Sequence, residues 1–99
     1  MYPLPEKESS RLIEQTNRIG VEFLLADLNT GMTFLQIAFV TSSPANRARN
    51  LGRACEVYRT VMRLLPRLVL APDAQLEIDR KLEDLKNSLE EAGYSCTGN

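Results

Sequence analysis

Residues 43–66 read SPANRARNLGRACEVYRTVMRLLP and contain the start, the body and the end of one amphipathic helix. At about 100° per residue, one side of this helix collects apolar residues: Leu51, Ala54, Cys55, Tyr58, Val61, Met62 and Leu65. The opposite side collects charged residues: Arg49, Arg53, Glu56, Arg59, Arg63 and Arg67. Ser43 is a suitable N-cap and Pro44 suits the first turn, where no backbone N–H is needed. Because Pro66 disfavours continuation, we expect a helix over residues 44–65.

A longer helix is predicted before this one, over about residues 8–42. Gly20 and the group at 29–31, Asn-Thr-Gly, look like helix breakers. The polar residues on both sides of that group nevertheless form one stripe at helical spacing: Arg11, Gln15, Arg18, Glu22, Asn29, Thr33 and Gln36. Since a break would usually reset the phase of such a stripe, we expect one helix that runs through, with at most a bend near Asn29.

A third helix is predicted over residues 73–92. Its apolar residues follow a 4-3-4-3 spacing, which is typical of the seam of a packed antiparallel bundle: Ile78, Leu82, Leu85, Leu89 and Ala92. Gly93 is the expected stop. The apolar connector at 66–72, PRLVLAP, should place residues 68–70 under the end of the bundle.

Short connections between consecutive helices make them antiparallel neighbours. The sequence therefore predicts an all-α fold, an antiparallel three-helix bundle with a long first helix. We expect one domain over residues 1–99, because a chain of 99 residues is long enough for one core and too short for two. Residues 1–7 and 94–99 are expected to be loose.

Charge is unevenly distributed although the net charge is only −1. Residues 44–67 contain six arginines and one glutamate, whereas residues 68–99 contain three basic and seven acidic residues. Residues 1–43 contain three basic and five acidic residues. A basic helix between two acidic ones, held partly by their attraction, accounts for this distribution.

The two cysteines indicate neither a zinc site nor a disulfide framework, since Cys55 lies on an apolar helix face and Cys96 in a polar tail. A reducing cytosol is therefore the expected location. The N-terminus, MYPLPEKESS, is acidic and contains proline, so we do not expect a signal peptide. No unbroken apolar run approaches the ~18 residues that a membrane span needs, so no membrane association is expected.

The second helix resembles the second helix of a tetratricopeptide repeat, because Ala54, Tyr58, Val61 and Pro66 keep its small–aromatic–small–proline spacing. The match covers residues 43–66 only. The preceding helix lacks the Trp-Leu-Gly-Tyr run, and no second repeat is visible. The three-helix layout is also similar to that of microtubule-interacting-and-trafficking domains. Both families bind peptides or partner helices in grooves between their own helices, so the resemblance implies a binding module rather than an enzyme.

Residue types that usually perform catalysis are scarce. The chain has no histidine, which removes the commonest general base and the commonest nitrogen ligand of metals. Gly31 and Gly52 stand alone rather than in a phosphate-binding loop. The acidic residues of the third helix fall mainly outside its apolar seam, unlike the inward-facing glutamates of two-metal bundles. We therefore expect no catalytic residue, no metal site, no cofactor and no enzymatic activity.

The arginine face of the second helix is one candidate binding surface, formed by Arg49, Arg53, Arg59 and Arg63. Three interpretations remain open. The face can be solvated with partners one turn away, can dock an acidic helix of another copy or protein, or can bind a phosphate backbone. The last would normally also require neighbouring aromatic residues, a flexible basic arm or a basic chain overall, and the sequence has none of these.

Asp27 falls inside the apolar arc of the first helix. Folding the first two helices antiparallel about Ser43 would bring it level with Tyr58 and Arg59. A carboxylate that enters an apolar interface needs a hydrogen-bond donor. We therefore predict a buried polar contact that joins the two helices, with Asp27 and Tyr58 as its members. A small pocket lined by Asp27 is the alternative.

The first helix outruns the second by about ten residues, which leaves apolar side chains without cover: Leu12, Ile13, Ile19 and Phe23. Contiguous exposed apolar patches are uncommon on monomers, and a two-fold partner could cover them with the same patch. We expect self-association through these residues. The alternative is that residues 68–70 fold back over them and leave a monomer.

The leading interpretation is a small bacterial helical domain of the cytosol that acts by protein–protein association, as a homodimer. A nucleic-acid-binding accessory protein that uses the arginine face is the second interpretation, and an enzyme is the third.

Overall fold

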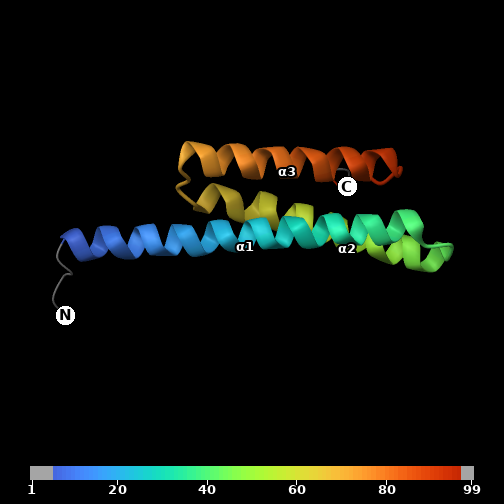
Figure 1. Cartoon of the computed structure of the whole chain (residues 1–99), viewed down its shortest axis with the longest axis horizontal. Helices are drawn as coiled ribbons and strands as arrows, with labels where there is room; N and C mark the ends of the chain where they lie inside the picture. The colour runs from blue at the N-terminus through green and yellow to red at the C-terminus, as the bar shows by residue number, and fades with distance from the viewer. Residues whose placement is uncertain (1–5, 97–99) are drawn as a thin grey trace.

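The computed structural model describes residues 6–96, without the side chains of residues 6–10 and 13. Its elements are α1 (Glu6–Val40), α2 (Pro44–Leu64), a 3₁₀ turn η1 (Leu65–Arg67) and α3 (Pro72–Glu91). The predicted all-α three-helix bundle is confirmed, and each helix boundary lies within two residues of the predicted one. Figure 1 shows α2 and α3 lying along the C-terminal part of α1, whose N-terminal part runs past both of them.

The long helix α1 is continuous through residues 29–31, as predicted from the unbroken phase of its polar stripe. Figure 1 draws it as one straight rod without a bend at this point. The hydroxyl groups of Thr30 and Thr33 donate to the carbonyl oxygens of Ala26 and Asn29, at 3.0 and 3.1 Å. All members of the polar stripe are exposed.

The corner between α1 and α2 is closed by side chains that satisfy both helix ends. The Ser43 hydroxyl accepts a hydrogen bond from the Asn46 backbone N–H at 3.2 Å, which makes Ser43 the predicted N-cap. From the other side, Arg47 donates through Nε to the Ala38 carbonyl and through Nη2 to the Thr41 carbonyl, both at 3.2 Å. These contacts satisfy carbonyl groups that the end of α1 leaves unpaired.

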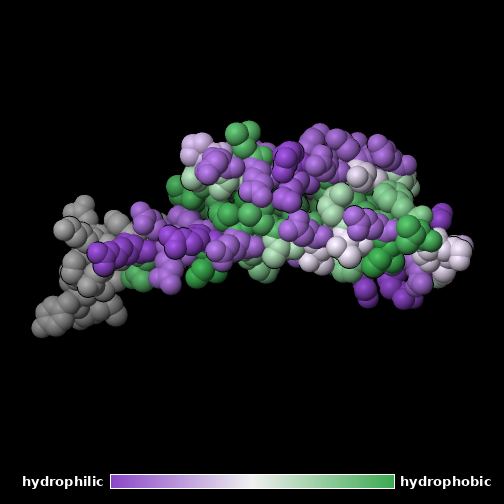
Figure 2. Space-filling model, in the orientation of Figure 1, coloured by the Kyte–Doolittle hydropathy of each residue, from purple (hydrophilic) through white to green (hydrophobic). Residues whose placement is uncertain are grey.

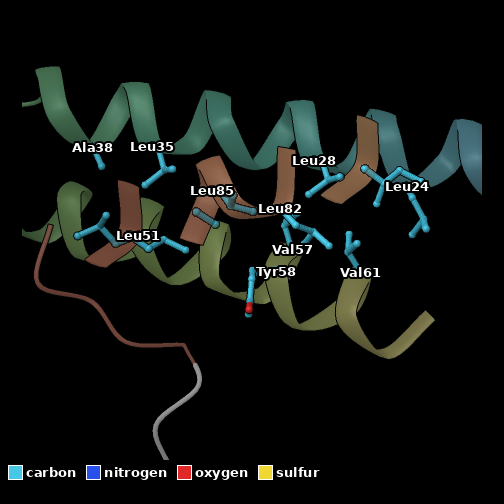
Figure 3. Close-up of a cluster of buried hydrophobic side chains, with 13 residues drawn as sticks. Leu24, Leu28, Leu35, Ala38, Leu51, Val57, Tyr58, Val61, Leu82 and Leu85 are labelled. Carbon is cyan, nitrogen blue, oxygen red and sulfur yellow. The ribbon is translucent and has the colours of Figure 1, made fainter. Parts of the chain in front are cut away.

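The core lies between the three helices, and α1 contacts both of the others. Its buried side chains come from every helix and are drawn in Figure 3. Gly31 lies close to both of the other helices: a Cβ there would lie 3.0 Å from Val57 Cγ1 on α2 and 3.4 Å from Leu85 Cδ2 on α3. The three helices therefore meet at the one position of the α1 core seam that has no side chain.

The connector packs onto α1 just beyond the start of the bundle. Leu68 lies so close to Gly20 that a Cβ there would be 2.7 Å from Leu68 Cδ2. The Val69 backbone N–H donates to Asn17 Oδ1 at 3.1 Å. Leu68 and Leu70 are partly buried against the core, as expected, whereas the Val69 side chain is 77% exposed.

The C-terminal segment is held against α2, which corrects two expectations. Gly93, with φ +78°, ends α3 as predicted. After it, Cys96 forms a disulfide with Cys55, and the Cys96 carbonyl accepts a hydrogen bond from Arg59 Nε at 3.2 Å. Residues 94–96 are therefore not loose, and the cysteines do pair; the expectation for residues 97–99 lies outside the described residues.

One segment of α1 is long and apolar enough on average to span a membrane, so the expectation of no membrane association stays a prediction. Within α1, the segment Glu14–Val40 is apolar enough on average, and only 28% of its most apolar window is buried inside the fold. The search for an unbroken apolar run missed it because single polar residues interrupt the segment at helical spacing. A buried core helix or a signal sequence passes the same test, so the segment is weak evidence for a span.

Two glycine substitutions test the packing at Gly31. Gly31→Ala should lower the free energy of unfolding by about 1 kcal/mol, because overpacking against the stiff Val57 side chain outweighs the better helix propensity of alanine. Gly52→Ala is the matched control, since its added Cβ would meet only the Tyr94 hydroxyl, at 3.7 Å. The control should raise stability by about 0.5–1 kcal/mol in urea denaturation. Equal effects of the two changes would contradict the packing described here.

The disulfide closes a loop with a sequence separation of 41 residues. Cys96→Ser should therefore lower the free energy of unfolding by about 2–4 kcal/mol, chiefly because the unfolded chain gains freedom. Dithiothreitol should lower the melting temperature of the wild type and leave that of the variant unchanged. A wild type whose melting temperature does not respond to the reductant would argue against the pairing.

Candidate functional site

An uncharged, exposed stripe runs along the outer side of α1 from residue 12 to residue 40. Its members alternate at spacings of four and three residues, and each of them is exposed: Leu12, Thr16, Ile19, Phe23, Ala26, Thr30, Thr33, Ile37 and Val40. The large apolar members are between 41% and 83% exposed. At 1.5 Å per residue, this outer stripe is ~42 Å long.

The outer stripe is the second heptad seam on the same helix. The first seam faces the core with the same spacing, and all its members are buried: Leu24, Leu28, Gly31, Leu35 and Ala38. The two seams lie about 140° apart around the helix axis. Since α2 and α3 together cover only the first seam, nothing in the described chain covers the second.

Figure 2 shows how the outer stripe relates to the polar surface of α1. Along the N-terminal half of α1 a row of hydrophilic residues faces the viewer, and hydrophobic atoms lie along its lower edge. By helical position, Arg11, Arg18 and Glu22 lie next to the outer stripe, and all three are exposed members of the predicted polar stripe. A charged strip therefore borders the apolar one.

Two acidic residues flank the outer stripe, one on each side by helical position. Glu22 precedes Phe23 on the side toward α3. On the same side Asn29 accepts a hydrogen bond through Oδ1 from Lys81 Nζ of α3, at 3.0 Å. Asp27 follows Ala26 on the side toward α2 and is partly buried. Burial raises the pKa of the Asp27 carboxyl above its usual value.

The residues predicted for self-association are exposed as expected, with Leu12 at 51%, Ile19 at 57% and Phe23 at 53%. The side chain of Ile13 lies outside the described residues. The connector does not cover the exposed three, because Leu68 packs on Gly20, on another side of the helix. The fold-back alternative is therefore not realised. The C-terminal half of the stripe was not predicted from the sequence, although its residues have the same spacing of four and three.

The predicted contact between Asp27 and Tyr58 does not form. Among the described residues Asp27 has no hydrogen-bond partner, and Figure 3 shows the Tyr58 hydroxyl directed away from α1. The physical reason is the register of the two helices. Gly31 lies against Val57, which places Asp27 near the level of Val61, almost one turn past Tyr58. Tyr58 instead lines a small hollow together with Lys86 and Tyr94.

The arginine face of α2 is divided between separate contacts within the fold. The Arg53 guanidinium lies over the Phe34 ring of α1, 5.6 Å from its centroid, whereas Arg59 binds the Cys96 carbonyl. A further arginine, Arg49, donates to Asn46 Oδ1 within α2 at 3.4 Å. Arg63 has no such contact among the described residues. The four side chains are all exposed but do not converge on one site.

The surface hollows described next do not provide a second candidate binding site. The larger one is an open depression between α1 and the connector, lined in part by Asn17, Val21, Val69 and Ala74. Within the described residues, no group of three or more histidine, cysteine, aspartate or glutamate side chains is placed to hold a metal ion.

Comparison with known protein families, with curated proteins and with solved structures gives no match for this chain. The resemblance to tetratricopeptide repeats and to microtubule-interacting-and-trafficking domains therefore stays a prediction. The outer stripe remains the candidate functional surface.

The partly buried Asp27 gives a test that depends on pH. Its raised pKa means that the folded state holds the proton more tightly than the unfolded state. The contribution of Asp27 to the free energy of unfolding is therefore largest below the pKa that it has in the unfolded state. It falls as the pH rises through the pKa that Asp27 has in the folded state. Asp27→Asn should then raise the urea midpoint at pH 7. If the predicted contact between Asp27 and Tyr58 had formed, the same substitution would have lowered that midpoint.

The difference between Asp27→Asn and the wild type should shrink toward zero near pH 3, where Asp27 is protonated in both states. Glu14→Gln is the matched control, because Glu14 is exposed on the same helix and lies outside the outer stripe and its flanking positions. A destabilised Asp27→Asn variant at pH 7 would show that the carboxylate has a favourable partner after all.

Proposed function

We propose that this protein is a helical interaction module that self-associates through the outer stripe of α1. One observation supports this: α1 has two apolar heptad seams, and the fold covers only one. A seam of this spacing is the surface on which helices pack in coiled coils and bundles. Single exposed apolar residues are ordinary on a protein surface, but a continuous uncharged seam of ~42 Å is not.

The gain from covering the stripe is substantial. Fully burying a side chain such as leucine, isoleucine or phenylalanine stabilises by roughly 1.5–3 kcal/mol relative to leaving it exposed. Leu12, Ile19, Phe23 and Ile37 are each about half exposed, so a partner seam would bury the remaining part of each. The middle of the stripe contains only small residues, Ala26, Thr30 and Thr33, which allows another helix to approach closely.

A protein partner fits the stripe better than a lipid surface. Helices that lie on membranes usually have lysine and arginine beside the apolar face. Here Arg11 and Arg18 border only the N-terminal part of the stripe, and the charged residues of α1 that flank its centre are acidic, Glu22 and Asp27. A helix that spanned the bilayer would place Asp27 and Asn29 near its middle, at a cost of a few kcal/mol for the charge.

The alternative of nucleic-acid binding through the arginine face receives less support. Two of its four arginines hold parts of the fold together, since Arg53 lies on Phe34 and Arg59 binds the tail. Phosphate binding would have to compete with these contacts. Location in the cytosol likewise stays a prediction, because disulfides such as Cys55–Cys96 persist mainly in oxidising compartments.

Sedimentation equilibrium tests the proposal. The wild type should be a dimer at tens of micromolar, and Phe23→Glu should shift the dissociation constant at least tenfold toward the monomer, because it places charge in the stripe. Leu76→Glu is the matched control: Leu76 is 72% exposed on α3, outside the stripe. The control should remain dimeric.

Circular dichroism should show equal helix content in the wild type and both variants. A wild type that is monomeric up to a few hundred micromolar would refute self-association. If that monomer co-floats with vesicles of neutral lipid, the stripe binds a membrane instead, and the proposal is also wrong.

A further inference from the structure

Building on the proposed self-association, we infer that two copies pair α1 with α1 in antiparallel orientation, in a register that seats Phe23 on Ala26 of the second copy. The partner is thus a second copy of this chain, and its contact is specified residue by residue. Three observations carry the inference: the order of large and small residues in the outer stripe, the charges beside it, and the side of α1 on which it lies.

The order of side-chain sizes suits an antiparallel pair. The stripe alternates between two kinds of heptad position, a and d. In an antiparallel pair, each layer combines an a position of one helix with a d position of the other. The inferred register gives the layers Leu12 with Ile37, Thr16 with Thr33, Ile19 with Thr30, and Phe23 with Ala26. Near the two-fold axis, each bulky side chain therefore faces a small one.

The flanking charges exclude a parallel pair. In a parallel heptad dimer, consider the residue that directly precedes a seam position on one helix. It lies beside the residue of the other helix whose number is higher by five. This would set Glu22 beside Asp27 of the second copy, and symmetry would repeat the contact. Two acidic pairs at one interface repel, and Asp27 is already partly desolvated in the monomer fold.

The same charges select the antiparallel register. In the inferred register Asp27 faces Gly20 of the second copy, and Glu22 faces Asn29. Asn29 already accepts a hydrogen bond from Lys81 through Oδ1, so its amide nitrogen is directed to other partners, and the Lys81 ammonium lies beside it. Glu22 of each copy therefore meets a donor and a positive charge.

Shifting the pair by one heptad in either direction brings like charges together. One shift sets Glu22 against Glu22, and the other sets Asp27 against Asp27. A shift by two heptads leaves Leu12 and Ile19, or their counterparts at the other end, without a partner. Among the registers that pair most of the outer stripe, the inferred register is therefore the one in which no two acidic residues face each other.

The surrounding fold leaves room for this contact. The outer stripe lies about 140° from the buried seam, so a second α1 can approach without displacing α2 or α3. The disulfide keeps both native cysteines bonded to each other, which leaves newly introduced thiols as the only reactive ones. This permits a cross-linking test on the intact protein.

The test uses two single variants, Leu12→Cys and Ile37→Cys, with a bismaleimide linker about 8 Å long and no reductant. In the inferred dimer the two Leu12 positions lie ~37 Å apart along the axis, so neither variant should cross-link to itself. An equimolar mixture, after subunit exchange, should give a covalent dimer. The control mixture of Leu12→Cys with Leu76→Cys should give none.

Each outcome separates the orientation from the self-association. Self-cross-linking of Leu12→Cys would show a parallel pair and overturn the antiparallel inference, while the proposed function would stand. A dimer by sedimentation without a cross-link in the mixture would overturn the inferred register. A monomer by sedimentation would refute the proposed function, and the orientation with it. Sedimentation of each cysteine variant verifies that the substitution itself leaves the dimer intact.

Discussion

The contact at Gly31 is the constraint on which the rest of the structure depends. Helix α1 approaches α2 and α3 closely at this level, where it has no side chain and Val57 and Leu85 lie opposite. That contact sets how far α2 slides along α1. It also sets the level at which α1 runs past α2. The outer stripe is exposed along its whole length because it lies on the side of α1 away from the core, so Ile37 and Val40 are exposed as well as Leu12 and Ile19. The outer stripe of α1 takes no part in this core and stays exposed.

Local signals in the sequence predicted the elements well. The phase of the polar stripe showed that α1 continues through residues 29–31, and Ser43, Pro44 and Gly93 marked helix ends that the structure confirms. These features depend on neighbouring residues, which a sequence shows directly. The exposure of Leu12, Ile19 and Phe23 was predicted from helix lengths, but its cause is their position on the outer side of α1, which exposes Ile37 and Val40 as well.

Features that depend on how side chains interlock could not be predicted in the same way. The register of α1 against α2 differs from simple folding about Ser43 by two residues, about half a turn, which places Asp27 near Val61 rather than beside Tyr58. The disulfide depends on the path of the chain after Gly93, where a left-handed residue turns it back toward Cys55. The C-terminal half of the outer stripe was obscured because Thr33 had been assigned to the polar stripe, although its spacing also fits the seam.

The central claim is that a second copy covers the outer stripe of α1, and amide hydrogen exchange of α1 as a function of protein concentration tests it most directly. Residues 11–19 extend beyond α2, so in a monomer their amides should exchange by local fraying. The account predicts that their protection rises at least tenfold between one and a few hundred micromolar, while protection of α3 stays constant. Protection of residues 11–19 that does not depend on concentration would contradict it.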